Sequence, residues 1–364
     1  MKKLRSSMKM LKYIFIFLFL FNISAFSSSF KLEKIFDLNV PWSLTFITTD
    51  EVLISDKEGE IILANIKNKT QKKIRHNLNF KVHGQGGLLE ILKHQDEIFI
   101  CYTENRGDGK TSTSIAKANF SRENLNFKNI FQANPAIDSG FHFGCRIVIK
   151  DGYLYAAPGE RGGGNIAQDP SNHIGKVIRI NLDGTAPKDN PKFKGKDNWL
   201  PEIYQIGIRN PQGMTIHPSN NKIYISNHGP RGGDFFGEIK FGENYGWQIW
   251  CWGGMNYTMT KCGEADKWDS RFTKPLYTWT PSIAASATQI YKGEEFKEWN
   301  NHILIATLNN QTLRKLEFLN ANEVGKETIL FKDTVGNIRD LKIGADGKIY
   351  LLGNGPGSLF VMKK

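Results

Sequence analysis

Five polar residues stand immediately in front of short apolar segments whose folding does not require them. They are Gln85, His142, Arg209, Asn210 and Arg339. An imidazole can accept a proton near neutral pH, and guanidinium and amide groups can hold a polar or anionic ligand. Brought together by the fold, the five residues would form a candidate ligand site. The alternative is that they only satisfy backbone groups of nearby loops.

A repeated unit of turn and strand predicts how these side chains are positioned. Six turns rich in Asp, Asn and Gly each precede a short strand of alternating or apolar residues, and an apolar strand also precedes each turn. The turns lie at Asp50, Asp96, Asp151-Gly152, Asn220-Asn221, Asn300-Asn301 and Asp346-Gly347. Such pairs supply the positive φ that tight turns require, so each unit is expected to be a β-hairpin.

The spacing of the turns indicates the fold class. Successive turns are 46, 55, 69, 80 and 46 residues apart, and a four-stranded propeller blade needs about 40–50 residues. The sequence therefore predicts an all-β protein, a six-bladed β-propeller with four-stranded antiparallel blades. A β-sandwich with long loops is the alternative, although sandwiches space their turns more closely. In a propeller the innermost strands line a central channel, so the five polar residues should meet at one channel mouth.

The N-terminus has the pattern of an export signal. Five basic residues precede the apolar run 13–21, and small residues follow at 22–29. The run is too short to span a bilayer, so we expect 1–27 to be a cleaved signal peptide and 28–364 to be a single propeller domain. A retained N-terminal anchor is the alternative. The mature protein is expected to be soluble, without a membrane span, and periplasmic.

Charge and cysteine content exclude several classes of function. Five of the 48 basic residues and none of the 36 acidic ones lie in 1–27, so the net charge falls from +12 to +7 in the mature chain. The lysines are scattered rather than clustered, which argues against nucleic-acid binding. The four cysteines have no CxxC spacing, which argues against a zinc or thioredoxin-type site. Cys251 and Cys262 share one Gly- and Trp-rich loop and are predicted to form a disulfide.

Several motifs in a fixed order resemble those of the soluble PQQ-dependent aldose sugar dehydrogenases, the glucose/sorbosone dehydrogenase family. The similarity runs from about Trp42 to the C-terminus. The motifs are Gly84-Gln-Gly-Gly-Leu-Leu89, His142-Phe-Gly-Cys-Arg146, the segment 169–184, Arg209-Asn-Pro-Gln-Gly213, Asn227-His-Gly-Pro-Arg-Gly-Gly-Asp234 and Asn244-Tyr-Gly-Trp247. The family consists of exported, calcium-dependent, six-bladed propellers, which agrees with the blade count made from the turns.

The resemblance implies roles for individual residues in oxidising an aldose at its anomeric carbon to a lactone. His142 would be the base that removes the hydroxyl proton. Glu160, where the family usually has Asp, would orient His142, and Arg209 would stabilise negative charge on the quinone. The resemblance also assigns cofactor-holding positions to Gln85, Arg209, Asn210, Tyr257 and Arg339.

The resemblance further implies calcium. Backbone carbonyls of Gly229 and Pro230 would hold an ion that joins the quinone to the protein and acts as a Lewis acid. Tyr245 resembles a backbone ligand of a second, structural calcium. The acidic partner usually found for that ion is replaced by Phe235.

Two departures from the family pattern concern the three carboxylates of PQQ. The first arginine of an Arg-x-Arg pair is replaced by Asn337, and the stretch Asn309-Asn-Gln311 offers amides in place of a cation. Each lost charge-assisted contact costs about 1.5–3 kcal/mol, an order of magnitude or more in affinity. We therefore expect Asn309, Gln311 and Asn337 to bind the cofactor more weakly than the family's cations do.

Other functions remain as alternatives at this point. One is an inactive periplasmic propeller that binds a ligand or a protein. Another is a calcium-dependent lactonase, although such sites hold calcium with acidic side chains, and the channel mouth of this chain presents Gln, His, Arg and Asn. A dehydrogenase would need an external electron acceptor, a small quinone or a periplasmic redox protein, because the chain has no CxxCH haem motif.

Overall fold

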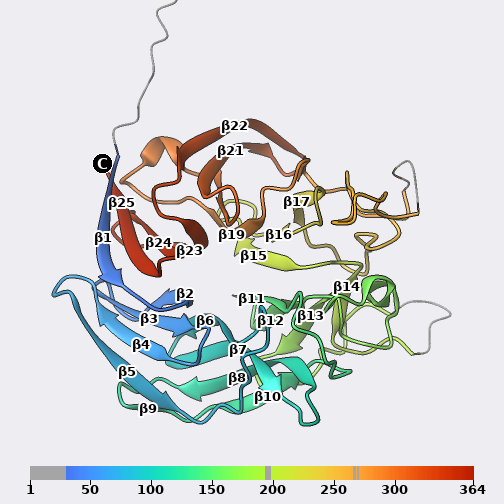
Figure 1. The fold of residues 1–364 in the computed structure, drawn as a ribbon, viewed down its shortest axis with the longest axis horizontal. Helices are drawn as coiled ribbons and strands as arrows, with labels where there is room; N and C mark the ends of the chain where they lie inside the picture. The colour runs from blue at the N-terminus through green and yellow to red at the C-terminus, as the bar shows by residue number, and fades with distance from the viewer. Residues whose placement is uncertain (1–29, 193–197, 265–267, 269) are drawn as a thin grey trace, which may run out of the picture.

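The computed structural model describes residues 30–192, 198–264, 268 and 270–364, so the predicted signal peptide lies outside the described residues. In the described part, 25 strands form six sheets arranged in a ring (Figure 1). The predicted six-bladed β-propeller is confirmed. No helix among these residues has the length and apolar character needed to cross a membrane.

Each blade is a small, mostly antiparallel sheet whose first strand is innermost and whose last strand is outermost. Blade 1 contains β2 (Pro41–Phe46), β3 (Glu51–Asp56), β4 (Ile61–Asn65) and β5 (Thr70–His76), with β9 (Asn124–Leu125) added parallel to β5. Blade 2 contains β6 (Leu88–His94), β7 (Glu97–Asn105), β8 (Thr111–Asn119) and β10 (Lys128–Gln132). Blade 3 contains β11 (Gly144–Lys150), β12 (Tyr153–Pro158), β13 (Lys176–Asn181) and β14 (Ile203–Ile206).

The remaining three blades follow the same order. Blade 4 contains β15 (Pro211–Ile216), β16 (Ile223–Asn227), β17 (Asp234–Glu238) and β18 (Tyr277–Trp279). Blade 5 contains β19 (Ala285–Ile290), β20 (Ile303–Thr307), β21 (Thr312–Asn320) and β22 (Glu323–Lys332). Blade 6 contains β23 (Asn337–Ile343), β24 (Ile349–Asn354), β25 (Ser358–Lys363) and β1 (Lys31–Asp37). Two short 3-10 helices, η1 (Gly164–Gln168) and η2 (Lys297–Trp299), lie in blade connections.

The six predicted hairpins are the first two strands of each blade. Second strands such as β7 are buried along almost their whole length, because a neighbouring blade packs against each face of the sheet. This explains their nearly continuous apolar runs. Outer strands such as β5 are mostly exposed and carry charged residues.

The ring is closed by the N-terminal strand. In blade 6, β1 pairs with the C-terminal strand β25, from Lys31 opposite Lys363 to Asp37 opposite Ser358. This pairing joins the two ends of the propeller, and its apolar contacts extend the core between blades 6 and 1. Similar apolar clusters lie between all other neighbouring blades of the described chain.

Two disulfides are present. Cys251–Cys262 is confirmed within the loop between β17 and β18. Cys101–Cys145, which was not predicted from the sequence, joins β7 of blade 2 to β11 of blade 3 and is completely buried. It lies three residues beyond His142, so it anchors the strand that follows this candidate residue.

Candidate active site

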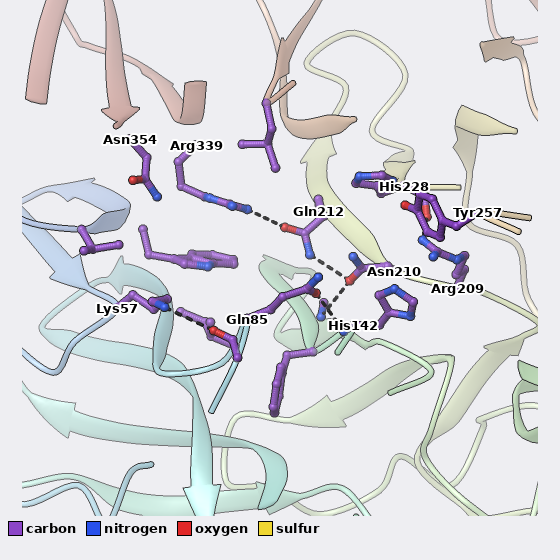
Figure 2. A pocket seen from close by; sticks show the side chains of 17 residues that line it. Lys57, Gln85, His142, Arg209, Asn210, Gln212, His228, Tyr257, Arg339 and Asn354 are labelled. Atoms are coloured by element: carbon purple, nitrogen blue, oxygen red, sulfur yellow. Dashed lines mark hydrogen bonds between the residues drawn. The ribbon is translucent and has the colours of Figure 1, made fainter. Parts of the chain in front are cut away.

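A cavity of about 290 Å³ opens where the inner strands begin, at one mouth of the central channel. All five residues of the candidate ligand site line it, as does Tyr257. They come from blades 2, 3, 4 and 6 and from the loop 251–262, so the propeller brings together side chains far apart in the sequence (Figure 2).

His142 and Glu160 form a directly bonded pair at the edge of this cavity. The Nδ1 atom of His142 contacts the Glu160 carboxylate through Oε1, and the backbone N–H of Gly164 donates to the other carboxylate oxygen at 2.7 Å. The side chain of His142 is 14% exposed and that of Glu160 only 1%. Because Nδ1 faces the carboxylate, Nε2 is left as the nitrogen able to accept a proton.

The charges of this pair follow from burial and from their contact. Burial lowers the pKa of His142, and this effect outweighs the opposing effect of the hydrogen bond that His142 donates to Glu160. Burial alone would raise the pKa of Glu160, but the contact with His142 and the Gly164 N–H bring that pKa below its usual range. The pair is therefore a neutral imidazole held by a carboxylate near pH 7, the arrangement a general base requires.

The backbone around His142 is fixed by close contacts. Its N–H donates to the Gln85 side-chain oxygen at 2.9 Å, and its φ of 46° lies in the left-handed region. A Cβ atom at Gly159 would lie 2.0 Å from the carbonyl oxygen of His142, so glycine is required there. Arg161 donates to the Phe141 carbonyl at 3.1 Å, and its guanidinium lies 3.8 Å from the ring centre of Phe143.

Arg209 places a buried cation beside His142. Its side chain is 4% exposed, and Nη1 donates to the carbonyls of His228 at 2.8 Å and Gly229 at 3.0 Å. Its guanidinium also lies 5.3 Å from the ring centre of Trp247. The Nε atom is buried and has no hydrogen-bond partner among the described residues. Burial lowers the pKa of Arg209, and its Nε–H is a buried donor that the described chain leaves unsatisfied.

A chain of amides crosses the cavity from blade 3 to blade 6 (Figure 2). Asn210 Oδ1 accepts hydrogen bonds from the Gly144 N–H at 3.2 Å and from Gln212 Nε2 at 2.9 Å. Gln212 Oε1 in turn accepts from Arg339 Nη1 at 2.9 Å. The Nε atom of Arg339 is buried without a partner in the described chain, and burial lowers the pKa of Arg339 to about 10.

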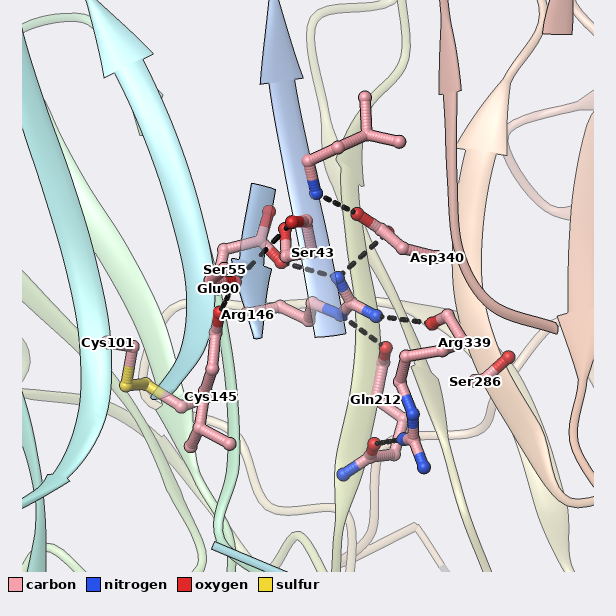
Figure 3. Close-up of polar contacts among 12 residues, drawn as sticks. Ser43, Ser55, Glu90, Cys101, Cys145, Arg146, Gln212, Ser286, Arg339 and Asp340 are labelled. Atoms are coloured by element: carbon pink, nitrogen blue, oxygen red, sulfur yellow. Dashed lines mark hydrogen bonds and ion pairs between the residues drawn. A yellow bond between two sulfur atoms is a disulfide. The ribbon is translucent and has the colours of Figure 1, made fainter. Parts of the chain in front are cut away.

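A buried ion cluster lies beneath this chain and supports it (Figure 3). The Arg146 Nη1 atom pairs with Glu90 and with Asp340, the latter at 2.8 Å. Its other nitrogens donate to backbone carbonyls, Nε to Gln212 at 2.6 Å and Nη2 to Arg339 at 2.9 Å. Burial alone would lower the pKa of Arg146, but the two carboxylates raise it. Arg146 thus holds the backbone of two residues that line the cavity.

Some residues assigned from the resemblance lie outside the cavity lining. Asn309, Gln311 and Asn337 are not among the lining residues, although Leu308 and Arg339 are. The structure adds lining residues that were missed from the sequence, namely Trp42, Lys57, Gln212, His228 and Asn354. Lys57 directly follows β3, and Asn354 ends β24. Residues at the ends of second strands therefore reach the same mouth as residues in front of first strands. This symmetry could have identified Lys57, His228 and Asn354.

Of the residues predicted to hold calcium, Gly229 is in direct contact with Arg209. The Gly229 carbonyl oxygen accepts from Arg209 Nη1 and is 2.6 Å from His228 Nδ1. Tyr245 is completely buried, its carbonyl accepts from Trp252 Nε1 at 2.9 Å, and its ring stacks on Phe235 with ring centres 4.5 Å apart. In the part of the chain that the structure describes, no group of three or more His, Cys, Asp or Glu residues is arranged to hold a metal ion.

The electrostatic character of the cavity is cationic. Lys57, Arg209 and Arg339 line it, and none of its described lining residues is Asp or Glu. Two of these cations keep a buried N–H without a partner in the described structure. The arrangement suits a ligand that carries anionic groups and is placed beside a neutral histidine base.

The chain is similar to sugar dehydrogenases along most of its length. The family model for glucose/sorbosone dehydrogenase matches residues 38–361. An aldose sugar dehydrogenase of Escherichia coli is 32% identical over 326 residues, covering 86% of this chain and 87% of the relative. Quinoprotein glucose dehydrogenase B of Acinetobacter calcoaceticus is 29% identical over 58% of this chain and 50% of its own length.

Solved structures extend the comparison. The apo-form crystal structure of the soluble aldose sugar dehydrogenase of Escherichia coli has a TM-score of 0.87 at 31% identity, covering 92% of this chain and 99% of that one. A PQQ-bound aldose sugar dehydrogenase of Streptomyces coelicolor has a TM-score of 0.74 at 21% identity, covering 92% and 98%. At this lower identity the similarity shows a common fold.

Proposed function

The chain belongs to the glucose/sorbosone dehydrogenase family, and we propose that it oxidises aldose sugars at the anomeric carbon to lactones. The proposal includes PQQ and calcium as cofactors and an external electron acceptor. It is supported by the names of the relatives and, above all, by one observation: a neutral His142, bonded to Glu160, faces a cationic cavity.

His142 is proposed to act as the general base. A sugar bound at the cavity mouth with its anomeric hydroxyl on Nε2 would transfer the hydroxyl proton to the imidazole as hydride leaves the anomeric carbon. Glu160 keeps the proton of Nδ1 on the side away from the sugar and stabilises the imidazolium that forms. The sugar loses two electrons and becomes a lactone.

The residues present fit PQQ. Its carboxylates require cations, and the cavity offers Lys57, Arg209 and Arg339, two of them with a buried N–H lacking a partner in the described structure. When bound, PQQ would supply the quinone that accepts the hydride. Arg209, packed against Trp247 and held by two carbonyls, would keep a fixed positive charge next to His142. Gln85, Asn210 and Tyr257 would complete the binding surface.

The calcium part of the proposal rests on the family resemblance. Gly229 and Pro230 would contribute carbonyl oxygens, which calcium accepts readily. The Gly229 oxygen is in contact with both Arg209 and His228 in this structure. Since a carbonyl oxygen has two lone pairs, one of these contacts would have to open before an ion could bind. Tyr245 is the proposed backbone ligand of a second calcium.

Export to the periplasm is also part of the proposal. The N-terminal pattern of 1–27 supports it, and so do the two disulfides, which form and persist in oxidising compartments. Electrons would then leave to a small quinone or a periplasmic redox protein.

The test is aldose-dependent reduction of an artificial dye by the full chain, titrated with PQQ in the presence and absence of Ca²⁺. We expect saturable activity that needs both additions. His142→Ala should abolish it, whereas His217→Ala, a buried histidine outside the cavity lining, should retain it if the variant stays folded. Sugar-dependent activity surviving in His142→Ala would contradict the base assignment. If the native chain shows neither activity nor PQQ binding, the ligand-binding module becomes the better description.

A further inference from the structure

We propose that Lys57 binds a carboxylate of the cofactor and, with Arg339, anchors the end of PQQ that lies away from His142. This inference rests on the proposed function, and it assigns to blade 1 a cation that the family resemblance does not predict. Asn337 and the amides at Asn309 and Gln311 lie outside the cavity lining, whereas Lys57 lines it.

The backbone of Lys57 is fixed at the channel mouth. Its N–H donates to the Val40 carbonyl at 2.8 Å, and its carbonyl accepts from the Leu88 N–H at 3.2 Å. Gly87 packs directly on it, because a Cβ there would lie 2.0 Å from the Lys57 oxygen and 2.8 Å from its Cγ atom. Glycine at position 87 therefore leaves the space through which the lysine stem passes.

The ammonium group is close to the cavity and has one N–H donor to spare. It donates to the Gly84 carbonyl at 3.2 Å and lies 3.2 Å from the Glu58 carboxylate. The side chain of Lys57 is 22% exposed, and that of Glu58 is 42% exposed. An ammonium has three N–H donors, and the partner carboxylate is largely solvated, so the group can still bind an anionic ligand.

The positions of the charged groups define two ends of the cavity. Figure 2 shows Lys57, Asn354 and Arg339 on one side and Arg209, His228 and Tyr257 on the other, with His142 near the second group. The buried ring of Trp42 also lines the cavity, and the Arg339 guanidinium lies 5.8 Å from its centre. A flat anionic molecule held at the first end would present its other end to His142 and Arg209.

Direct binding of PQQ to the full chain, followed by tryptophan fluorescence without sugar, tests this inference. Lys57→Gln should weaken binding by about ten-fold or more, the loss expected for one charge-assisted contact. Lys57→Arg should restore most of the affinity. Lys81→Gln is the matched control, because that lysine also donates to a loop carbonyl at 3.2 Å but does not line the cavity.

Two further measurements separate the possible outcomes. Added salt should weaken PQQ binding by the native chain more than by Lys57→Gln, because the variant lacks one of the charges that salt screens. The trimethyl ester of PQQ should bind both proteins equally. Equal PQQ affinity and salt dependence in the native chain and Lys57→Gln would overturn the role of Lys57 while leaving the proposed function intact. Absence of PQQ binding by the native chain would overturn both.

Discussion

The substitution Glu160→Gln removes one charge from the site and keeps the size of the side chain. In the native protein the carboxylate faces Nδ1 of His142, so this nitrogen must be the donor. A glutamine amide can present either its oxygen or its NH₂ group to Nδ1, so it no longer fixes the tautomer that leaves Nε2 free. It would also no longer stabilise the positive charge that would develop on the imidazole during the proposed proton removal.

The expected loss of rate follows from the strength of that contact. A hydrogen bond to a charged group contributes about 1.5–3 kcal/mol, so its loss in the transition state should lower kcat by about 10- to 150-fold. The KM for the sugar should change little, because Glu160 is 1% exposed and is not a lining residue of the cavity. A lower kcat at constant KM indicates loss of an interaction specific to the transition state.

The pH profile provides a second readout. The Glu160 contact raises the pKa of His142 against the stronger effect of burial. Removing the carboxylate should therefore lower that pKa further, and the acid limb of the kcat profile should move to lower pH. The direction is informative because a general base loses activity as it becomes protonated.

Dye reduction by the PQQ-loaded protein, measured from acid to neutral pH, gives both kcat and the position of the acid limb. Glu202→Gln is the matched control, since Glu202 lies 3.2 Å from Nε2 of the buried His173 outside the cavity. An unchanged kcat in Glu160→Gln, or an acid limb displaced to higher pH, would refute the assignment of Glu160 as the residue that orients the base.

Two other predictions concern stability and are checked by denaturant unfolding. Arg146→Met should destabilise the protein by about 3 kcal/mol, the lower end of the range for a broken buried ion pair. Glu90 and Asp340 lose their guanidinium partner and keep only the Lys342 ammonium, 2.9 Å and 3.7 Å away. A stability equal to the native value would show that the cluster tolerates the loss of Arg146. Replacing both cysteines of Cys101–Cys145 by serine should lower the free energy of unfolding by about 4 kcal/mol, and the same change at Cys251–Cys262 should lower it by about 3 kcal/mol. The difference arises because the two disulfides close loops of 44 and 11 residues. A larger loss at Cys251–Cys262 would contradict this entropic argument.

The blade count was predictable because each blade repeats a local signal. A turn such as Asp151-Gly152 and the strands on its two sides are neighbours in the sequence, so their pairing is visible without the fold. The convergence of residues such as His142 and Arg209 then followed from the symmetry of a propeller. The role of each side chain depended on the family motifs, because the residue types alone indicate only a ligand site.

Features that depend on distant pairing were missed. Strand β1 has no turn marker, and its partner β25 is at the other end of the chain. The disulfide Cys101–Cys145 joins neighbouring blades, and the spacing of its two cysteines carries no signal for a bond between sheets. Lys57 was missed for a related reason, because only residues in front of first strands were considered. The predicted signal peptide stays a prediction.

The architecture explains how the cavity can keep its character when individual cations are replaced. Lining residues come from all six blades, and blades 1, 4 and 6 each contribute residues from both the start of the first strand and the end of the second strand. If Lys57 binds the cofactor as proposed, it supplies from blade 1, the next blade around the ring, a cation that is absent at Asn337 in blade 6. The buried Arg146 donates to the backbone carbonyls of Gln212 and Arg339. These contacts do not depend on which blade supplies the cation. Binding groups can thus move between blades while the positions of His142 and Arg209, which the proposed chemistry requires, stay fixed.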